Sequence, residues 1–258
     1  MKLIPIAPFG VQIDQLNLAE PLAEDTASRI KHLLADHCVV VFRDQHALTD
    51  QGFLDVLSNL GTLTFTQGET PVPGAPQLNL VTNVGRTTKP RSVFHTDTSY
   101  VTKTPAYTAL RIVTVPQAGG DTLFTNQYTA FDTLPARIKN ALTGARVLHQ
   151  VTGLDTATLE ETETWHDLVR RHPLNNRPAL YLSTPERCVA LSTMPGVQGQ
   201  RVIKALYQHA IRTRRLLRHR WRAGDVVMWD NRCTMHRADH SDVIGDRTLH
   251  RGMTLASA

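Results

Sequence analysis

The apolar residues of the first sixty positions predict a helix, a buried strand and a second helix. Segment 21–37 has an apolar face at helical spacing, and the β-branched run at 39–42 that follows it is typical of a buried strand. Segment 48–61 repeats the helical spacing, with Thr49 as N-cap and Gly61 as C-terminal stop. The apolar positions are Ala27, Ile30, Leu33 and Leu34 in the first helix and Phe53, Leu54, Leu57 and Leu60 in the second.

The middle of the chain alternates between loops and short elements. Residues 62–92 are rich in Thr, Pro, Gly and Asn, which predicts a long loop with one short strand at LNLV (78–81); loops of this length often cover active sites. Segment 108–115 predicts a strand, and a turn at Gly119 and Gly120 then leads through a short strand to a helix. Weaker patterns suggest a short helix at ETWHDLVRRHP (163–173) and a strand at ALYLS (179–183).

The C-terminal third predicts a helix at 200–213 and then strands separated by turns and a polar loop. Many short strands, with helices gathered at a few points, favour a β-sandwich or barrel with helical insertions. The chain has no internal repeat, low-complexity tract or linker. We therefore predict one domain over residues 1–258.

Composition excludes several classes of protein. With 258 residues, 41% hydrophobic and 20% charged, the chain resembles an ordinary globular protein. The N-terminal MKLIPIAPFGVQI lacks both a signal-peptide core and a membrane span, so we expect a cytoplasmic location and no membrane partner. Cys38, Cys188 and Cys233 are odd in number and lack a CxxC pair, which argues against a disulfide framework or a zinc ribbon. They should be reduced and buried.

The net charge of +5 and the pI near 9.3 favour anionic partners, and a small anionic substrate satisfies them as well as nucleic acid does. The most basic stretch, residues 211–222, invites a nucleic-acid hypothesis. Within it, Arg218 and Arg220 alternate with His219 and Trp221, which is typical of a solvated strand face. We therefore expect no nucleic-acid partner.

His95 and Asp97 stand two apart in SVFHTDTSY, a stretch that reads as a strand or strand edge. Alternate residues of a strand point to the same face, so both side chains can meet one ion while Thr96 turns away. The pair alone is weak, because twelve histidines make such a spacing easy to find by chance. His240 and Asp242 form a second pair in a polar loop, where a solvated turn explains them.

A distant histidine on a neighbouring strand would complete the first site. Non-haem iron(II) enzymes that activate oxygen bind iron through two histidines and one carboxylate, which leaves three positions open. The segment GDVVMWDNRCTMHRA predicts a strand, a turn at 230–231 and then His236 at the start of the next strand. His236 is thus the candidate third ligand.

Four segments together resemble the taurine and phenoxyacetate-herbicide dioxygenase family of Fe(II)/2-oxoglutarate oxygenases. The resemblance implies a mainly β fold: a double-stranded β-helix, or jelly-roll, core with flanking helices. It also implies that His95, Asp97 and His236 bind iron(II), with 2-oxoglutarate and O2 as cosubstrates. The segments are HTDTSY (95–100), VPQAGGDTLFTNQYTAFDTLP (115–135), WRAGDVVMWDNRCTMHRA (221–238) and DRTLHRGM (246–253).

The same resemblance extends to the cosubstrate and substrate. The family's 2-oxoglutarate ligands, a Thr 27 residues after the first His and an Arg 11 after the last, correspond to Thr122 and Arg247. The arginine that binds the substrate's acidic group, 15 residues after the last His, corresponds to Arg251. Arg247 and Arg251 are an even number apart on one predicted strand, so both can face the interior. A structural ion pair is the alternative role for Arg251.

Two positions differ from the taurine-specific members, which have a His and an Asn where this chain has Thr66 and Arg91. We therefore do not expect taurine as the substrate. Arg91 either meets an anionic group of the substrate or is a solvated charge of the loop.

The reaction implied by the resemblance is hydroxylation of a small anionic organic substrate with release of succinate and CO2. Candidate classes are a sulfonate, a sulfate ester, an aryloxy or alkyl carboxylate and an amino-acid derivative. Two alternatives stay open: a nucleic-acid-acting oxygenase of the same class and a non-enzymatic metal-binding jelly-roll protein. A homo-oligomer, dimer or tetramer, is compatible with the sequence.

Overall fold

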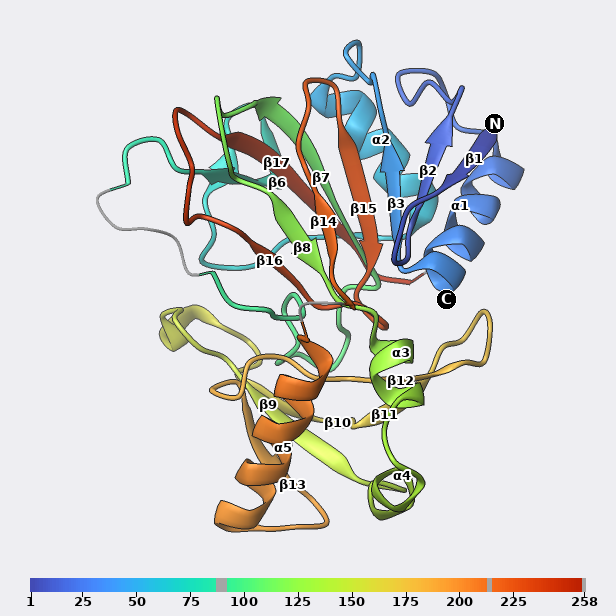
Figure 1. Cartoon of the computed structure of the whole chain (residues 1–258). Helices are drawn as coiled ribbons and strands as arrows, with labels where there is room; N and C mark the ends of the chain where they lie inside the picture. Colours follow the sequence, from blue (N-terminus) through green and yellow to red (C-terminus); the bar gives the residue numbers. More distant parts are fainter. Residues whose placement is uncertain (87–91, 213–214, 257–258) are drawn as a thin grey trace.

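The computed structural model describes residues 1–86, 92–212 and 215–256 (Figure 1). Both helices predicted near the N-terminus are confirmed. The first, α1 (Glu24–His37), buries the four predicted apolar positions. The second, α2 (Asp50–Leu60), begins after Thr49, whose side chain accepts a hydrogen bond from the backbone N–H of Gly52. Between the helices, β3 (Val39–Phe42) is fully buried, as its β-branched run predicts.

Nine strands of the described chain form the larger sheet. All five residues of β15 are buried, because this strand pairs with β3 on one side and with β7 on the other. Helices α1 and α2 pack on one face of the sheet and share a hydrophobic core with it. The strands run in the order β1 (Lys2–Pro5), β2 (Val11–Asp14), β3, β15 (Val226–Asp230), β7 (Tyr107–Thr114), β17 (Thr248–Thr254), β6 (Ala75–Thr82) and β5 (Pro71–Val72), with β4 (Leu63–Thr64) paired to β17.

A smaller sheet covers the opposite face. The alternation along β15 separates two cores: Val226 and Met228 face the helices, whereas Val227 and Trp229 belong to a core that also contains Phe124 and other residues of the smaller sheet. Two facing, largely antiparallel sheets form the jelly-roll core that was predicted. The smaller sheet consists of β14 (Leu217–His219), β8 (Thr122–Phe124) and β16 (His236–Ala238), with β8 in the centre.

The chain between β8 and β14 builds a lobe below the two sheets in the view of Figure 1. Its core packs around α5, which confirms that a helix forms here. The helix begins four residues before the predicted range of 200–213 and ends at Ala210, and residue 213 lies outside the described residues. The predicted helix after β8 is also confirmed, divided into two short helices. The lobe contains α3 (Gln127–Asp132), α4 (Ala136–Ala141), β9 (Arg146–Gln150), a 3-10 turn (Thr156–Thr158), β10 (Glu163–Asp167), β11 (Val169–Arg171), β12 (Pro178–Leu180), β13 (Cys188–Leu191) and α5 (Gly196–Ala210).

The helix predicted at 163–173 is wrong, because this segment forms the strands β10 and β11. Strand β10 pairs along its whole length with β9, which places His166 opposite Val147. His166 and Leu168 are buried, so the segment follows a period of two. Long-range pairing therefore outweighs the weak local preference of so short a segment.

The loop predicted at 62–92 is also partly wrong. It contains β4, β5 and the eight-residue β6, of which LNLV (78–81) is only a part. Strand β6 lies near the edge of the larger sheet, where one polar face is tolerated, and this polarity conceals the strand in the sequence. Its pairing with β17 places Asn79 opposite Arg251.

All three cysteines are free and buried, as predicted. No helix in the described ranges has the length and apolar character needed to cross a bilayer. The single-domain organisation stays a prediction.

Candidate metal centre and its pocket

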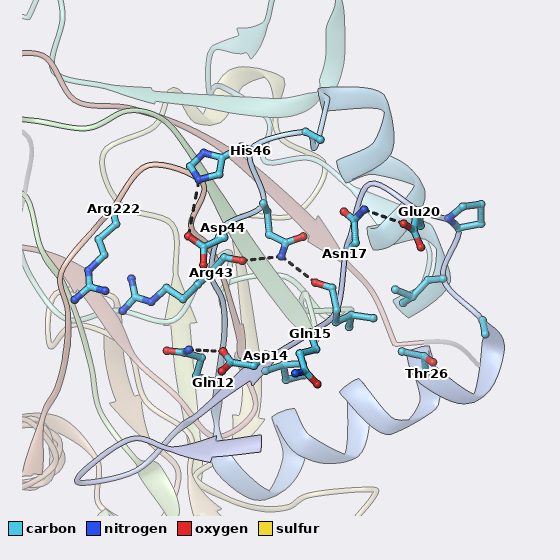
Figure 2. A pocket seen from close by; sticks show the side chains of 17 residues that line it. Gln12, Asp14, Gln15, Asn17, Glu20, Thr26, Arg43, Asp44, His46 and Arg222 are labelled. Carbon is cyan, nitrogen blue, oxygen red and sulfur yellow. Dashed lines mark hydrogen bonds and ion pairs between the residues drawn. The ribbon is translucent and has the colours of Figure 1, made fainter. Parts of the chain in front are cut away.

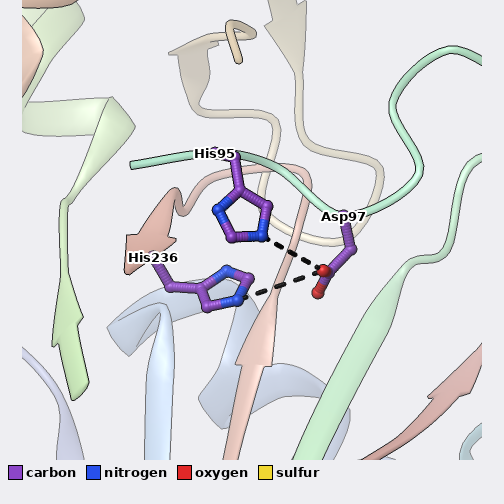
Figure 3. Close-up of side chains that lie close together, drawn as sticks. All are labelled: His95, Asp97 and His236. Atoms are coloured by element: carbon purple, nitrogen blue, oxygen red, sulfur yellow. Dashed lines mark ion pairs between the residues drawn. The ribbon is translucent and has the colours of Figure 1, made fainter. Parts of the chain in front are cut away.

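Three side chains from distant parts of the sequence meet beside the smaller sheet (Figure 3). His95 and His236 are partners in an isolated antiparallel bridge, and each backbone N–H donates to the other's carbonyl oxygen at 3.0 Å. The Oδ1 atom of Asp97 lies 3.7 Å from His95 Nε2 and 3.9 Å from His236 Nε2. The structure thus brings together the three predicted ligands.

The segment around them forms the edge of a strand, one of the two forms that were expected, and not a full strand. His95 makes only the single bridge, and Asp97 lies at the start of a turn. The alternation nevertheless holds over these residues, because Thr96 points away and its hydroxyl donates to the carbonyl oxygen of Leu182 at 2.8 Å. Two extended residues are enough to place His95 and Asp97 on one side.

The donor atoms suit a cation. Nδ1 of His95 lies 3.0 Å from the carbonyl oxygen of Val93, which can only accept, so Nδ1 carries the hydrogen and Nε2 presents a lone pair. The two imidazole nitrogens and the carboxylate oxygen lie within 4.8 Å of one another. Three facing acceptors are stabilised by a metal ion between them, and two histidines with one carboxylate are the ligand set of non-haem iron(II).

The electrostatics of the site agree with this chemistry. Burial lowers the pKa of His236 to about 3, so the imidazole is neutral near pH 7 and can act as a ligand. Burial alone would raise the pKa of Asp97, but the neighbouring His236, His95 and Arg251 hold it well below its usual range. Asp97 is therefore ionised, and Arg251 carries the permanent positive charge beside it.

A chain of hydrogen bonds orients the Asp97 carboxylate. The hydroxyl of Thr108 donates to Oδ2 of Asp97 at 2.8 Å, and the amide of Asn231 donates to that hydroxyl, also at 2.8 Å. The indole N–H of Trp229 donates to the Asn231 side-chain oxygen at 3.1 Å, which fixes the amide. Because Oδ2 is occupied, Oδ1 is the atom directed at the two histidines.

Replacing Thr108 with valine is expected to weaken metal binding by about 10- to 100-fold, the usual effect of losing a partner that orients a ligand. Valine has nearly the same shape but cannot donate to Oδ2. Calorimetric titration of the protein with Mn(II) measures the change. The control is Thr114→Val on the same strand, where the side chain is exposed; equal affinities for the two variants would contradict the role of Thr108.

Two buried histidines of the lobe hold the turn that begins at Asp97. Nδ1 of His149 lies 3.0 Å from the hydroxyl of Ser99, and Nε2 of His166 lies 2.9 Å from the Ser99 carbonyl oxygen. The guanidinium of Arg170 donates to Nδ1 of His166, so the hydrogen of this imidazole is on Nε2 and is donated to Ser99. Burial, with Arg170 adding to it, lowers the pKa of His166 to about 4.

This shift makes folding pH-dependent. In the unfolded chain His166 takes up a proton near its ordinary pKa of 6.5, whereas in the folded protein it does so only at about 4. Stability is therefore complete above pH 6.5 and falls as the pH drops toward 4, by about 3 kcal/mol for this group. In urea unfolding at several pH values, His166→Gln should lose less stability on acidification than the wild type. Equal losses would contradict the assignment.

Arg247 and Thr122, the predicted 2-oxoglutarate ligands, lie together in a cavity of about 160 Å³ that His95 and His236 also line. Arg247 directly precedes β17, is 2% exposed and donates through Nη2 to the Thr122 hydroxyl at 3.5 Å. Its Nε donates to the carbonyl oxygen of Gly120 at 2.8 Å. A β-carbon at Gly120 would lie 2.7 Å from Arg247 Cδ, so the Gly-Gly turn makes room for this side chain.

Arg247 is a buried cation. Burial lowers its pKa to about 10, which still leaves it charged near pH 7. In the described part of the chain, no carboxylate lies within ion-pair distance of its guanidinium. A buried charge is costly unless it is paired, so this position suits a carboxylate supplied by a ligand.

The two residues of the second His-x-Asp pair, His240 and Asp242, differ in their exposure to solvent. Asp242 is exposed, but His240 is half-buried and lines the same cavity as Arg247 and Arg86. The expectation of a solvated turn is therefore wrong for His240. Among the described residues, the pair is not part of a cluster that could hold a metal ion.

A second cavity, of about 290 Å³, adjoins the first and shares His95, Glu69 and Arg251 with it. It is lined by Arg251 and by Thr66, the predicted substrate residues. The Thr66 hydroxyl lies 3.0 Å from that of Thr98, and this bond ties the 65–70 segment to the Asp97 turn. Arg251 approaches Oδ1 of Asp97 at 3.5 Å and Oε1 of Glu69 at 3.6 Å.

Sequence reasoning missed Arg187 and Glu69, which line this cavity with Tyr100. Neither residue lies in a recognisable motif, so no signal in the sequence identified them. Arg91, the remaining predicted substrate residue, lies outside the described residues.

A larger hollow, of about 1000 Å³, lies away from the triad, beside β2 and β3 (Figure 2). Its acidic and basic side chains are mixed, and Arg43 is paired with the buried Asp225. Asp44 and His46, 3.8 Å apart, are largely exposed. None of the triad lines it, so we assign it no part in the chemistry.

A jelly roll with a two-histidine, one-carboxylate cluster and a buried arginine beside it defines an Fe(II)- and 2-oxoglutarate-dependent dioxygenase. The comparison with known families agrees. Residues 2–253 match the model of the taurine catabolism dioxygenase TauD, TfdA family, and the chain belongs to this family. The protein is therefore an oxidoreductase that uses iron, 2-oxoglutarate and O2, and the non-enzymatic alternative is excluded.

Individual relatives support the assignment along the whole chain. The alpha-ketoglutarate-dependent 2,4-dichlorophenoxyacetate dioxygenase of Cupriavidus pinatubonensis is 29% identical, over 98% of this chain and 97% of the relative. The alpha-ketoglutarate-dependent sulfate ester dioxygenase of Pseudomonas putida is also 29% identical, over 89% of this chain and 81% of the relative. Among solved structures, a taurine dioxygenase from Burkholderia xenovorans (28% identity, 99% and 91% covered) superposes with a TM-score of 0.85. The structure of AAD-2 in complex with Mn(II) and N-oxalylglycine superposes with a TM-score of 0.87, at 25% identity over 99% of this chain and 98% of that chain.

Proposed function

We propose that His95, Asp97 and His236 bind iron(II), and that Arg247 and Thr122 bind the distal carboxylate of 2-oxoglutarate. The observation that carries the proposal is the convergence of three metal-compatible donors with a buried guanidinium in one cavity. Iron(II) with 2-oxoglutarate and O2 supplies the oxidising power that hydroxylates an unactivated C–H bond, with release of succinate and CO2.

The side chains of the protein orient the cosubstrate and the metal ligands. Arg247 orients the cosubstrate through a planar guanidinium that can form two parallel hydrogen bonds to a carboxylate. Thr108 and Asn231 keep one oxygen of Asp97 directed at the histidines. The segment 65–70, tied to the Asp97 turn by Thr66 and Thr98, contributes Thr66 and Glu69 to the lining of the substrate cavity.

We further propose that the substrate is a small anionic organic compound bound in the cavity of about 290 Å³, with its acidic group on Arg251. The volume is at the lower end of the range for ligand pockets. The names of the relatives include a sulfate ester dioxygenase and a dichlorophenoxyacetate dioxygenase, which supports sulfate esters and aryloxy carboxylates as classes to test. Sulfonates, alkyl carboxylates and amino-acid derivatives complete the screen, as the classes expected from the sequence. Thr66 in place of the histidine of taurine-specific members favours a substrate other than taurine.

Two experiments test these proposals. Anaerobic addition of Fe(II) and 2-oxoglutarate should produce a visible charge-transfer absorption band, and its absence would contradict the site. A screen of these substrate classes should then reveal 2-oxoglutarate-dependent succinate release. Succinate must be matched to modified substrate, because uncoupled turnover also produces it.

The remaining expectations concern partners and location. Arg218, in the basic stretch, forms ion pairs with Asp121 and Asp239, which supports a structural role for this residue in place of nucleic-acid binding. Salt-sensitive binding of an oligonucleotide would favour the alternative. A cytoplasmic location and a dimeric or tetrameric state stay predictions.

A further inference from the structure

Arg187, a residue of the lobe, is a second arginine of the substrate cavity. It lies in the connection between β12 and β13, and its backbone is fixed at both ends. Its N–H donates to the carbonyl oxygen of Thr184 at 2.9 Å, and its carbonyl oxygen accepts from the N–H of Gln150 at 2.8 Å. The base of this side chain is therefore held rigidly beside β9.

The guanidinium of Arg187 is positioned as well. Its Nη1 donates to the carbonyl oxygen of Thr96 at 3.2 Å, and its carbon lies 5.5 Å from the centre of the Tyr100 ring. Arg251 approaches the next residue, Asp97, through its side chain. The two guanidiniums thus reach the same two-residue segment from different elements, one from the lobe and one from β17.

The substrate cavity is lined by further charged side chains besides Asp97, which the metal would hold. Among the described residues that line it, Arg187 and Arg251 are the cations and Glu69 is the remaining carboxylate. Glu69 lies 3.6 Å from Arg251, and its side chain is 36% exposed, so it can turn outward when an anion takes its place. Two guanidiniums that line one cavity can each form charge-assisted hydrogen bonds to a separate anionic group of the same ligand.

We propose that the substrate of this enzyme carries two anionic groups, one bound by Arg251 and the second by Arg187, with the carbon to be hydroxylated between them above the triad. The inference rests on the proposed function and narrows its substrate class to organic dianions, such as a sulfonate or sulfate ester with a carboxylate at its far end. Glu69 occupies Arg251 until the dianion displaces it.

The test uses calorimetry to compare the affinities of matched ligands for the enzyme loaded with Mn(II) and 2-oxoglutarate. The Mn(II)-loaded enzyme binds the ligands but does not turn them over. The probes are ω-sulfoalkanoates of increasing chain length, each paired with the alkanesulfonate of the same carbon number. At least one dianion should bind about 10- to 100-fold more tightly than its monoanionic partner, the range of one charge-assisted hydrogen bond. Arg187→Gln should remove this preference and leave the alkanesulfonates within about threefold of their wild-type affinity, whereas Arg187→Lys should restore part of it.

The control variant is Arg220→Gln, an exposed arginine outside the cavity, which should preserve the preference. If no dianion binds more tightly than its monoanion, or if Arg187→Gln weakens both ligands equally, the proposal is overturned; the second result would assign Arg187 to support of Thr96 alone. Failure of the proposed function would be distinct, because the Fe(II) and 2-oxoglutarate absorption band would then be missing before any substrate is added.

Discussion

Replacing Asp97 with alanine should abolish turnover, with kcat/KM lower by at least about 1000-fold, or roughly 4 kcal/mol of transition-state stabilisation. The carboxylate is 3% exposed and faces both histidines, so its loss removes the one anionic donor of the cluster. Two neutral imidazoles bind a divalent cation much more weakly than the complete set does. Arg251 would in addition lose a partner and repel the metal.

The measurements are the anaerobic absorption band with Fe(II) and 2-oxoglutarate, and succinate formation under air. The matched control is Asp242→Ala, since Asp242 has the same spacing from a histidine but is exposed and outside the cluster. This variant should keep both signals. A band of normal intensity in Asp97→Ala would show that the metal lies elsewhere.

The second large effect is expected at Arg247. Methionine has a similar length and no charge, so Arg247→Met should raise the dissociation constant for 2-oxoglutarate by about 100- to 1000-fold, equivalent to roughly 3–4 kcal/mol for a buried charge pair. Metal binding should change little, because Arg247 is not within reach of the triad carboxylate. The loss thus separates cosubstrate binding from metal binding.

Titration of the Mn(II)-loaded protein with 2-oxoglutarate measures the effect. Arg218→Met serves as the control, since Arg218 is an arginine of the neighbouring smaller sheet that forms surface ion pairs with Asp121 and Asp239. Exposed pairs contribute less than about 1 kcal/mol, so this variant should bind 2-oxoglutarate normally. An unchanged affinity in Arg247→Met would refute the assignment.

The elements that the sequence predicted well have strong local patterns. Helices α1 and α2 were evident because their apolar stripes, and the Thr49 cap of α2, depend only on neighbouring residues. The jelly roll and the triad followed from the motifs, whose spacings carried the resemblance to the family. The local pattern alone was ambiguous, since His240 and Asp242 have the same spacing as His95 and Asp97.

The strands and cavity residues that the sequence did not predict share a physical cause. Strand β10 is stabilised by pairing with β9, which is separated from it by residues 151–162, and β6 by pairing with β17, which is separated from it by residues 83–247. Both partners lie outside the segment whose local pattern was interpreted. Glu69 and Arg187 reach the substrate cavity because loops from two parts of the fold converge there. A single sequence contains no periodicity that reports such convergence, so side chains of this kind are found only from the three-dimensional arrangement.

The support of the Asp97 turn by the lobe has a consequence for engineering. Ser99 is held by His149 of β9 and His166 of β10, and Thr96 is held by the residues that follow β12. A chimera that exchanges the lobe with that of a relative, in order to transplant substrate preference, would therefore also alter the metal site. Such an exchange needs to transfer residues 96–100 together with β9, β10 and β12 as one cassette, so that the iron ligand keeps its own supports.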